Sequence, residues 1–112
     1  MALTLKSGSL LLAVMLMASL AGAQTVAVDA GKARALFEVH ECAGCHQVDT
    51  KVVGPALKQV AEKYRGDKEA ASRLLEKVKK GGAGVWGEIP MPPHAGTSDD
   101  ELKVVIAWIL AQ

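Results

Sequence analysis

The sequence of 112 residues predicts an all-α protein. Three observations support this fold class: apolar residues recur at helical spacing in four segments, residues that cap or break helices stand at the ends of those segments, and no segment shows the alternation of a β-strand. The length suits one small domain. We therefore expect about four helices in a single domain.

The N-terminal segment has the composition of a secretory signal peptide. Lys6 precedes an apolar run over residues 10–18, and Ala21 and Ala23 supply the small side chains that a signal peptidase selects. An uncleaved membrane anchor is the alternative, but the strongly apolar centre is shorter than the ~20 residues that a spanning helix requires. We expect residues 1–23 to be removed on export and residues 24–112 to form the domain, without stable membrane association.

Composition limits both the partners and the core. Residues 1–23 contain one charged side chain, Lys6, so the remaining 89 residues carry 12 Lys or Arg and 12 Asp or Glu. A net charge near zero argues against nucleic acid as a partner. A domain of this size buries only about 60% of its unfolded surface, and few aromatic residues are available to fill its core: Phe37, Tyr64, Trp86 and Trp108. A bound group is therefore expected to complete the core.

Two helices are predicted in the first half of the mature chain. Asp29 caps the first, over residues 30–41, whose inner face carries Ala33, Leu36, Phe37 and His40. Pro55 suits the first turn of the second, which Gly66 ends. The apolar stripe of that second helix consists of Leu57, Val60, Ala61 and Tyr64.

Two more helices are predicted in the second half. Asp67 caps the third, which ends at Gly81 and Gly82. Ser98 and Glu101 form a capping box for the last. The inner residues are Ala70, Ala71, Leu74, Leu75 and Val78 in the third helix, and Leu102, Val105, Ile106, Ile109 and Leu110 in the fourth. Phe37 and Trp108 are expected to pack the two terminal helices together.

The stretch Cys42, Cys45 and His46 forms a C-x-x-C-H motif. One helical turn separates the two cysteines, so both thiols can form thioethers to one haem, and the adjacent imidazole can reach its iron. A thioredoxin-like redox pair would require a preceding strand. A structural zinc site would need four ligands, and outside the motif only His40 and His94 remain to complete one. A local disulfide would leave the core incomplete. The motif favours one covalently bound haem c.

Met91 is the best candidate for the second axial ligand. It is the one methionine outside the signal segment, and it lies between Pro90 and Pro92 in the Gly- and Pro-rich stretch 81–97. The prolines stiffen this segment, which lowers the entropic cost of holding a weak thioether ligand. A methionine that only fills a gap in the core is the alternative. Two protein ligands leave no open position on the iron, which favours electron transfer over substrate binding.

The chain resembles the small bacterial monohaem class I cytochromes c, of the cytochrome c-551 or cytochrome c8 type. The stretches CAGCHQVDTKVVGPAL, KKGGAGVWGEIPMPPH and DDELKVVIAWIL carry this resemblance. It implies a monomeric class I cytochrome c domain over residues 24–112. It also implies a soluble periplasmic carrier that shuttles electrons between respiratory complexes and a terminal reductase or oxidase, with other redox proteins as its partners.

The resemblance also implies roles for individual residues. Cys42 and Cys45 attach the haem, and His46 and Met91 ligate its iron. The Pro55 carbonyl accepts a hydrogen bond from the proximal imidazole, and the Trp86 indole donates to a haem propionate. Lys77 stands where some relatives have a propionate-binding arginine, and it keeps the charge without the planar fork.

Three other features remain open at the level of sequence. His94 replaces an asparagine that some relatives direct at the ligand sulfur, and it is a surface residue, a partner near the haem or a substitute ligand. His40 is a partly buried structural residue or a redox-linked proton site. Lysines at positions 51, 58, 77, 79 and 80 form a solvated face or steer acidic partners. Apolar residues could dock partners instead: Ala43, Val52, Ile89 and Pro92.

A haem enzyme or gas sensor with an open axial position is the alternative function. Cytochromes c′ are built in that way, but their attachment motif lies near the C-terminus of a longer bundle. Here the motif follows the first predicted helix, and Met91 lies downstream of it. An electron carrier without enzymatic activity is therefore the expected function.

Overall fold

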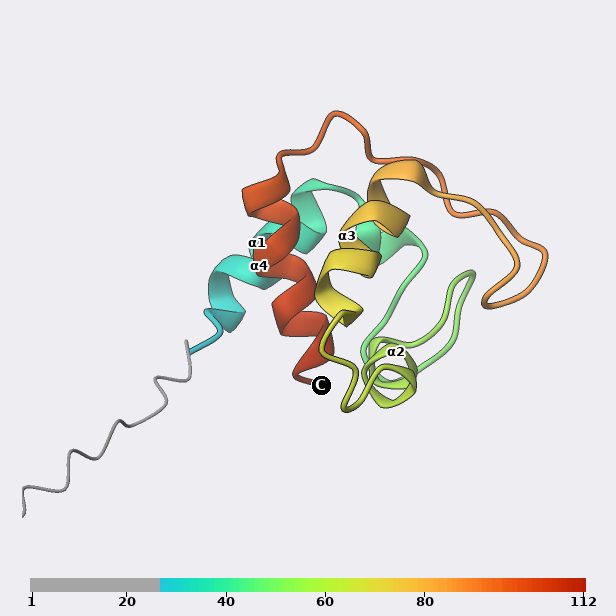
Figure 1. The fold of residues 1–112 in the computed structure, drawn as a ribbon. Helices are drawn as coiled ribbons and strands as arrows, with labels where there is room; N and C mark the ends of the chain where they lie inside the picture. Colours follow the sequence, from blue (N-terminus) through green and yellow to red (C-terminus); the bar gives the residue numbers. More distant parts are fainter. Residues whose placement is uncertain (1–26) are drawn as a thin grey trace, which may run out of the picture.

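A computed structural model describes residues 27–112 as an all-α fold (Figure 1). The helices are α1 (Ala30–Val39), the short 3₁₀ helix η1 (Cys42–Gly44), α2 (Leu57–Lys63), α3 (Ala70–Lys80) and α4 (Asp99–Leu110). Residues 27–112 contain no strand, only two isolated antiparallel bridges, His46 to Lys51 and Gly82 to Met91. The predicted fold class is confirmed. The predicted signal peptide lies outside the described residues.

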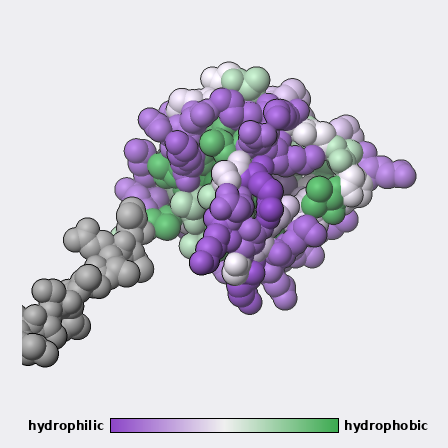
Figure 2. Space-filling view, viewed as in Figure 1, coloured by the Kyte–Doolittle hydropathy of each residue, from purple (hydrophilic) through white to green (hydrophobic). Residues whose placement is uncertain are grey.

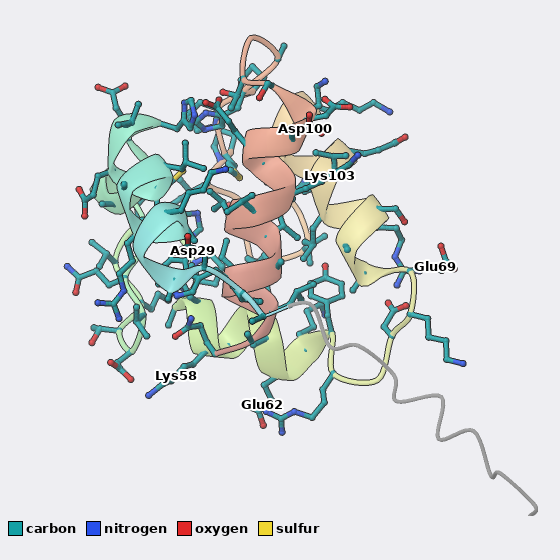
Figure 3. All side chains as sticks on the ribbon, turned by 90° about the vertical axis from the view of Figure 1, so that its left-hand side faces the viewer. Asp29, Lys58, Glu62, Glu69, Asp100 and Lys103 are labelled. Carbon is teal, nitrogen blue, oxygen red and sulfur yellow. The ribbon has the colours of Figure 1, made fainter. Side chains whose placement is uncertain are left out.

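The C-terminal helix α4 is the centre of the fold. In Figure 1 it crosses α1, and α1, α2 and α3 each pack against α4 rather than against one another. Charged side chains of the helices point outward, as Figure 3 shows for Lys58, Glu62 and Lys103. None of the helices within residues 27–112 has the length and apolar character needed to cross a membrane.

The contact between α1 and α4 forms the main packed core. The rings of Phe37 and Trp108 meet edge to face, with centroids 5.5 Å apart and an angle of 71° between their planes. Ala33 is fully buried, which allows α1 to approach α4 closely. The predicted pairing of the terminal helices through Phe37 and Trp108 is confirmed.

Local capping chemistry fixes the ends of α1 and α4. Asp29 accepts a hydrogen bond from the Lys32 N–H at 2.9 Å, as predicted. Ser98 Oγ accepts from the Glu101 N–H at 3.2 Å, so half of the predicted capping box is present. The other half is wrong, because the Glu101 carboxylate lies 3.1 Å from His40 Nε2 at the end of α1. His40 is thus a half-buried residue that links two helices.

The predicted starts of α2 and α3 need correction. Pro55 precedes α2 instead of occupying its first turn, because Ala56 is the N-cap and its N–H donates to Gln59 Oε1 at 3.0 Å. The Pro55 carbonyl is therefore left outside the helix. In the second case α3 begins at Ala70, because the Asp67 carboxylate accepts from the Glu69 N–H at 2.9 Å and forms a turn ahead of the helix.

The predicted inner face of α3 is only partly correct. Ala70 is buried, whereas Leu74, Leu75 and Val78 are half-buried and Ala71 is exposed. Leu74 and Val78 line a cavity. On α4, Leu102, Val105 and Ile106 are buried as predicted, but Ile109 and Leu110 are half-buried.

Candidate functional site

A large apolar cavity lies between the helices and the two long loops. It contains about 1430 Å³ of space free of protein atoms, its open mouth included. The helices contribute mainly aliphatic side chains to its walls: Leu57, Val60, Leu74, Val78, Leu102, Val105, Ile106 and Ile109. Residues 82–92 and the motif Cys42, Cys45 and His46 also contribute to the walls. The outer surface is mostly hydrophilic on the face shown in Figure 2.

The turn η1 brings the C-x-x-C-H residues to one side of this cavity. The Cys45 and His46 N–H groups both donate to the Cys42 carbonyl, at 3.1 and 3.0 Å. The two cysteines are half-buried free thiols that line the cavity together. Burial raises the pKa of the Cys42 thiol above its ordinary value, and the nearby Cys45 and Glu38 add to this rise. Two adjacent thiols therefore face an apolar space.

The imidazole of His46 is held in one orientation. Its Nδ1 lies 2.8 Å from the Pro55 carbonyl oxygen. A carbonyl can only accept, so Nδ1 carries a proton, and in the neutral ring Nε2 then keeps its lone pair. The chain at Gly54 passes so close to the ring that a Cβ there would lie 2.8 Å from Nδ1 and 2.9 Å from Nε2. His46 thus presents an oriented nitrogen donor at the cavity, which is what a metal-ligating histidine needs.

The loop that carries Met91 is pinned at its base. The Gly82 N–H donates to the Met91 carbonyl at 2.9 Å, and the Met91 N–H donates to the Gly82 carbonyl at 3.0 Å. Met91 is half-buried and lines the same cavity as His46. Its thioether sulfur is a soft, weak donor. The fold therefore places one nitrogen and one sulfur donor in a single apolar space.

The remaining predicted site residues fall into two groups. Pro55, Trp86 and Lys77 line the cavity. Trp86 is 38% exposed, and the Lys63 ammonium lies 5.4 Å from its ring centroid, a cation–π contact that the sequence did not reveal. His40 and His94 are not among the lining residues, and the His94 N–H donates to the Val78 carbonyl at 3.0 Å.

Tyr64 is a lining residue that sequence reasoning assigned only to the packing stripe of the second helix. It caps the C-terminal end of α2 at the edge of the cavity. An aromatic residue with a polar tip at the end of an apolar stripe was the available signal.

These features fit a haem. The walls suit a large apolar ring, the two thiols suit covalent attachment, and His46 and Met91 suit axial ligation. A zinc site of the usual kind would require a cluster of His, Cys, Asp or Glu, and residues 27–112 bring together no group of three or more.

Comparison with known proteins gives one consistent family. Residues 30–112 match the family model described as cytochrome c. Cytochrome c-552 of Nitrosomonas europaea is 52% identical over 75 residues, which are 67% of this chain and 73% of the relative. Cytochrome c-551 of Allochromatium vinosum is 47% identical over 88 residues, which are 79% of this chain and 94% of the relative.

Solved structures agree with the sequence matches. The crystal structure of Nitrosomonas europaea cytochrome c552 superposes with a TM-score of 0.67 at 50% identity, covering 70% of this chain and 96% of that one. The class 1 cytochrome MtoD from Sideroxydans lithotrophicus superposes with a TM-score of 0.65 at 32% identity, covering 76% and 97%.

Proposed function

The chain belongs to the cytochrome c family, and from this premise we propose that Cys42, Cys45, His46 and Met91 hold its haem. Cytochromes c carry one covalently bound haem c and transfer electrons, so this chain is an electron carrier and not an enzyme. When bound, the haem iron supplies the one-electron oxidation and reduction. The protein has to attach the group, ligate it and exclude other ligands.

Each of these four residues receives one role in this proposal. Cys42 and Cys45 form the two thioethers, which their free thiols and shared cavity support. His46 gives the proximal nitrogen, because its Nδ1 proton is engaged by Pro55 and its Nε2 is free to ligate. Met91 gives the distal sulfur from the pinned base of its loop. The single observation that carries the proposal is that one cavity joins an oriented imidazole, a pinned thioether and two thiols.

Three neighbours complete the proposed haem environment. The Pro55 carbonyl fixes the tautomer of His46. The Trp86 indole N–H and the Lys77 ammonium supply a donor and a positive charge for the haem propionates, and both side chains line the cavity. Lys63 packs over the Trp86 ring and supports its position.

We assign the protein to the periplasm, as a monomer that exchanges electrons between respiratory complexes and a terminal reductase or oxidase. The signal-like residues 1–23 support export, with cleavage after Ala23. Mass spectrometry of the exported protein tests this: a mass for residues 24–112 plus one haem supports it, and retention of residues 1–23 contradicts it.

Ligation by two protein residues is tested with carbon monoxide. Reduced wild-type protein should bind CO slowly at neutral pH, because Met91 occupies the distal position. Met91→Ala should bind CO rapidly and lose the weak far-red band of ferric iron bound to thioether sulfur. Thr97→Ala is the control, since Thr97 belongs to the same stretch 81–97 and does not line the cavity. Rapid CO binding by the wild type would instead favour the haem enzyme or sensor.

Docking of redox partners is assigned mainly to apolar residues near the cavity mouth. Val52 and Ile89 are 49% and 67% exposed. Several of the candidate steering lysines are partly neutralised, because Lys58 pairs with Asp49, Lys79 with Asp99 and Lys80 with Glu76. The electron-exchange rate with a physiological partner should therefore depend weakly on ionic strength. A steep fall with salt would assign docking to the lysines.

A further inference from the structure

The segment that follows the Met91 loop is attached to the C-terminal end of α3. The Met91 carbonyl accepts from the Gly82 N–H at 2.9 Å, and the His94 N–H donates to the Val78 carbonyl at 3.0 Å. Val78 lies in the last turn of α3, and Gly82 follows its C-cap residue Gly81. The position of Met91 is therefore set by backbone contacts with α3.

Gly81 lies at the point of closest approach. It has φ 67° and ψ −155°, a backbone conformation that is essentially restricted to glycine. A Cβ at Gly81 would lie 2.8 Å from Pro93 N and 2.9 Å from Pro92 C, and closer still to the Met91 carbonyl oxygen. Real Cβ atoms essentially never come within 3.0 Å of such atoms.

The clash with a Cβ could not be relieved by rotating a side chain. All three contacted atoms are backbone atoms, and two of them belong to prolines, whose φ angles are fixed. The 91–93 segment would have to move away from α3 as a unit. This movement would displace the Met91 thioether, which is a weak ligand and tolerates little displacement.

We propose that Gly81 is a positioning residue for Met91, because its missing side chain lets the 91–93 backbone seat against the end of α3. The proposal rests on the proposed role of Met91 as iron ligand. It assigns to Gly81 more than the ordinary task of ending a helix: the glycine determines how far the thioether reaches into the cavity.

Gly66 and Gly96 are controls, and neither lines the cavity. Gly66 follows α2 with φ 79°, close to the 67° of Gly81, and a Cβ there would meet nothing within 4 Å. Gly96 belongs to the same Gly- and Pro-rich stretch as Met91, and a Cβ there also has open space. Gly66→Ala introduces the strain of positive φ, and neither alanine makes a contact to the Met91 segment.

The experiment compares oxidised and reduced holoprotein of the wild type, Gly81→Ala, Gly66→Ala and Gly96→Ala. Gly81→Ala should retain covalent haem and its helical circular dichroism, yet lose the far-red sulfur–iron band at neutral pH. Its reduced form should bind CO faster than the wild type by about tenfold or more, the factor that corresponds to about 1.4 kcal/mol of weakened ligation. Both controls should keep the band.

Distinct outcomes separate the positioning role of Gly81 from the proposed ligation by Met91. A wild type without the band would contradict ligation by Met91 itself. A wild type and Gly81→Ala with equal bands and equal CO rates would overturn the positioning role alone. Loss of the band that occurs only together with loss of helicity would also overturn the positioning role, because a purely structural role of Gly81 predicts that result. If Gly81→Ala yields no holoprotein, His94→Pro, which removes the donor to Val78, must weaken the band for the proposal to stand.

Discussion

At the scale of single residues, Glu41 is the one non-glycine residue within 27–112 with a positive φ, at 60°. It lies directly before Cys42, where the chain leaves α1 and enters η1. The left-handed conformation costs a residue with a side chain roughly 1–2 kcal/mol. Substitution by glycine removes this cost, but part of the gain is lost because glycine loses more conformational freedom on folding.

Glu41→Gly should therefore raise the free energy of unfolding of the holoprotein by about 0.5–1 kcal/mol. Guanidinium chloride unfolding measures this change. Glu38→Gly, an exposed site inside α1, is the control and should lower stability by about 1 kcal/mol. A destabilised Glu41→Gly would mean that the Glu41 side chain makes a contribution larger than its backbone cost.

Asp99 provides the pH dependence at this scale. A hydrogen bond and the charge of Lys79 hold the pKa of the Asp99 carboxyl below its ordinary value of 3.8. A carboxyl with a depressed pKa in the folded state stabilises the fold above pH 3.8, and this contribution disappears as the pH falls through the folded pKa. Asp99 lies at the start of α4 and Lys79 near the end of α3, so the pair joins two helices.

Asp99→Asn should consequently flatten the acid side of the stability profile at pH values below 3.8, the ordinary pKa of the carboxyl. Equilibrium unfolding at a series of pH values measures the slope. Asp100→Asn is the matched control, because Asp100 is another exposed carboxylate in the first turn of α4 (Figure 3). An acid slope that Asp100→Asn reduces as much as Asp99→Asn would attribute the effect to the helix end rather than to Lys79.

At the scale of elements, the contact between α1 and α4 depends on Phe37. Its ring is 6% exposed, packs on Trp108 and also lines the cavity. Phe37→Ala should lower the free energy of unfolding by about 3–5 kcal/mol, since it leaves a void between the helices. Phe37→Leu preserves more volume and should cost much less. Equal losses for the two variants, by denaturant unfolding, would show that volume at this position is not what joins α1 to α4.

The elements also show what the sequence could and could not predict. Asp29 and Ser98 act within one turn of their own helix, so their capping could be read from spacing. Glu101 could not be assigned correctly, because its partner His40 lies 61 residues away and competes with the local capping box. The start of α3 was misplaced for a similar reason: the Asp67 carboxylate closes a turn before the helix instead of capping it.

The candidate site follows the same division. The spacing of Cys42, Cys45 and His46 is local, and the proline-flanked Met91 is the one methionine in residues 24–112, so all four could be proposed as haem-binding residues from the sequence alone. The base of the Met91 loop was not predictable, because it depends on the paired N–H and carbonyl groups of Gly82 and Met91. The contact of Lys63 with Trp86 joins α2 to a loop, and no spacing in the sequence indicates it.

At the scale of the whole molecule, the fold depends on its bound group. The helices α1, α2 and α3 pack on α4 and not on one another, and the apolar walls of the cavity are shared by all four. A domain this small has little core to spare. Without haem, the cavity walls would meet water or collapse.

A variant with Cys42→Ala and Cys45→Ala should therefore be largely unfolded at 25 °C when prepared without haem. Far-UV circular dichroism measures the loss of helicity relative to the holoprotein. The single variant Gly44→Ala is a control in the same turn, because Gly44 has open space around it. A haem-free variant with the full helical signal and a cooperative melt would show that the α1–α4 core suffices alone.

The most direct test of iron ligation by His46 and Met91 is X-ray absorption at the iron edge of the oxidised holoprotein, because sulfur and nitrogen scatter differently. Ligation by this pair predicts one sulfur scatterer beside the nitrogen scatterers, and its loss in Met91→Ala. Nitrogen or oxygen scatterers alone in the wild type would contradict it.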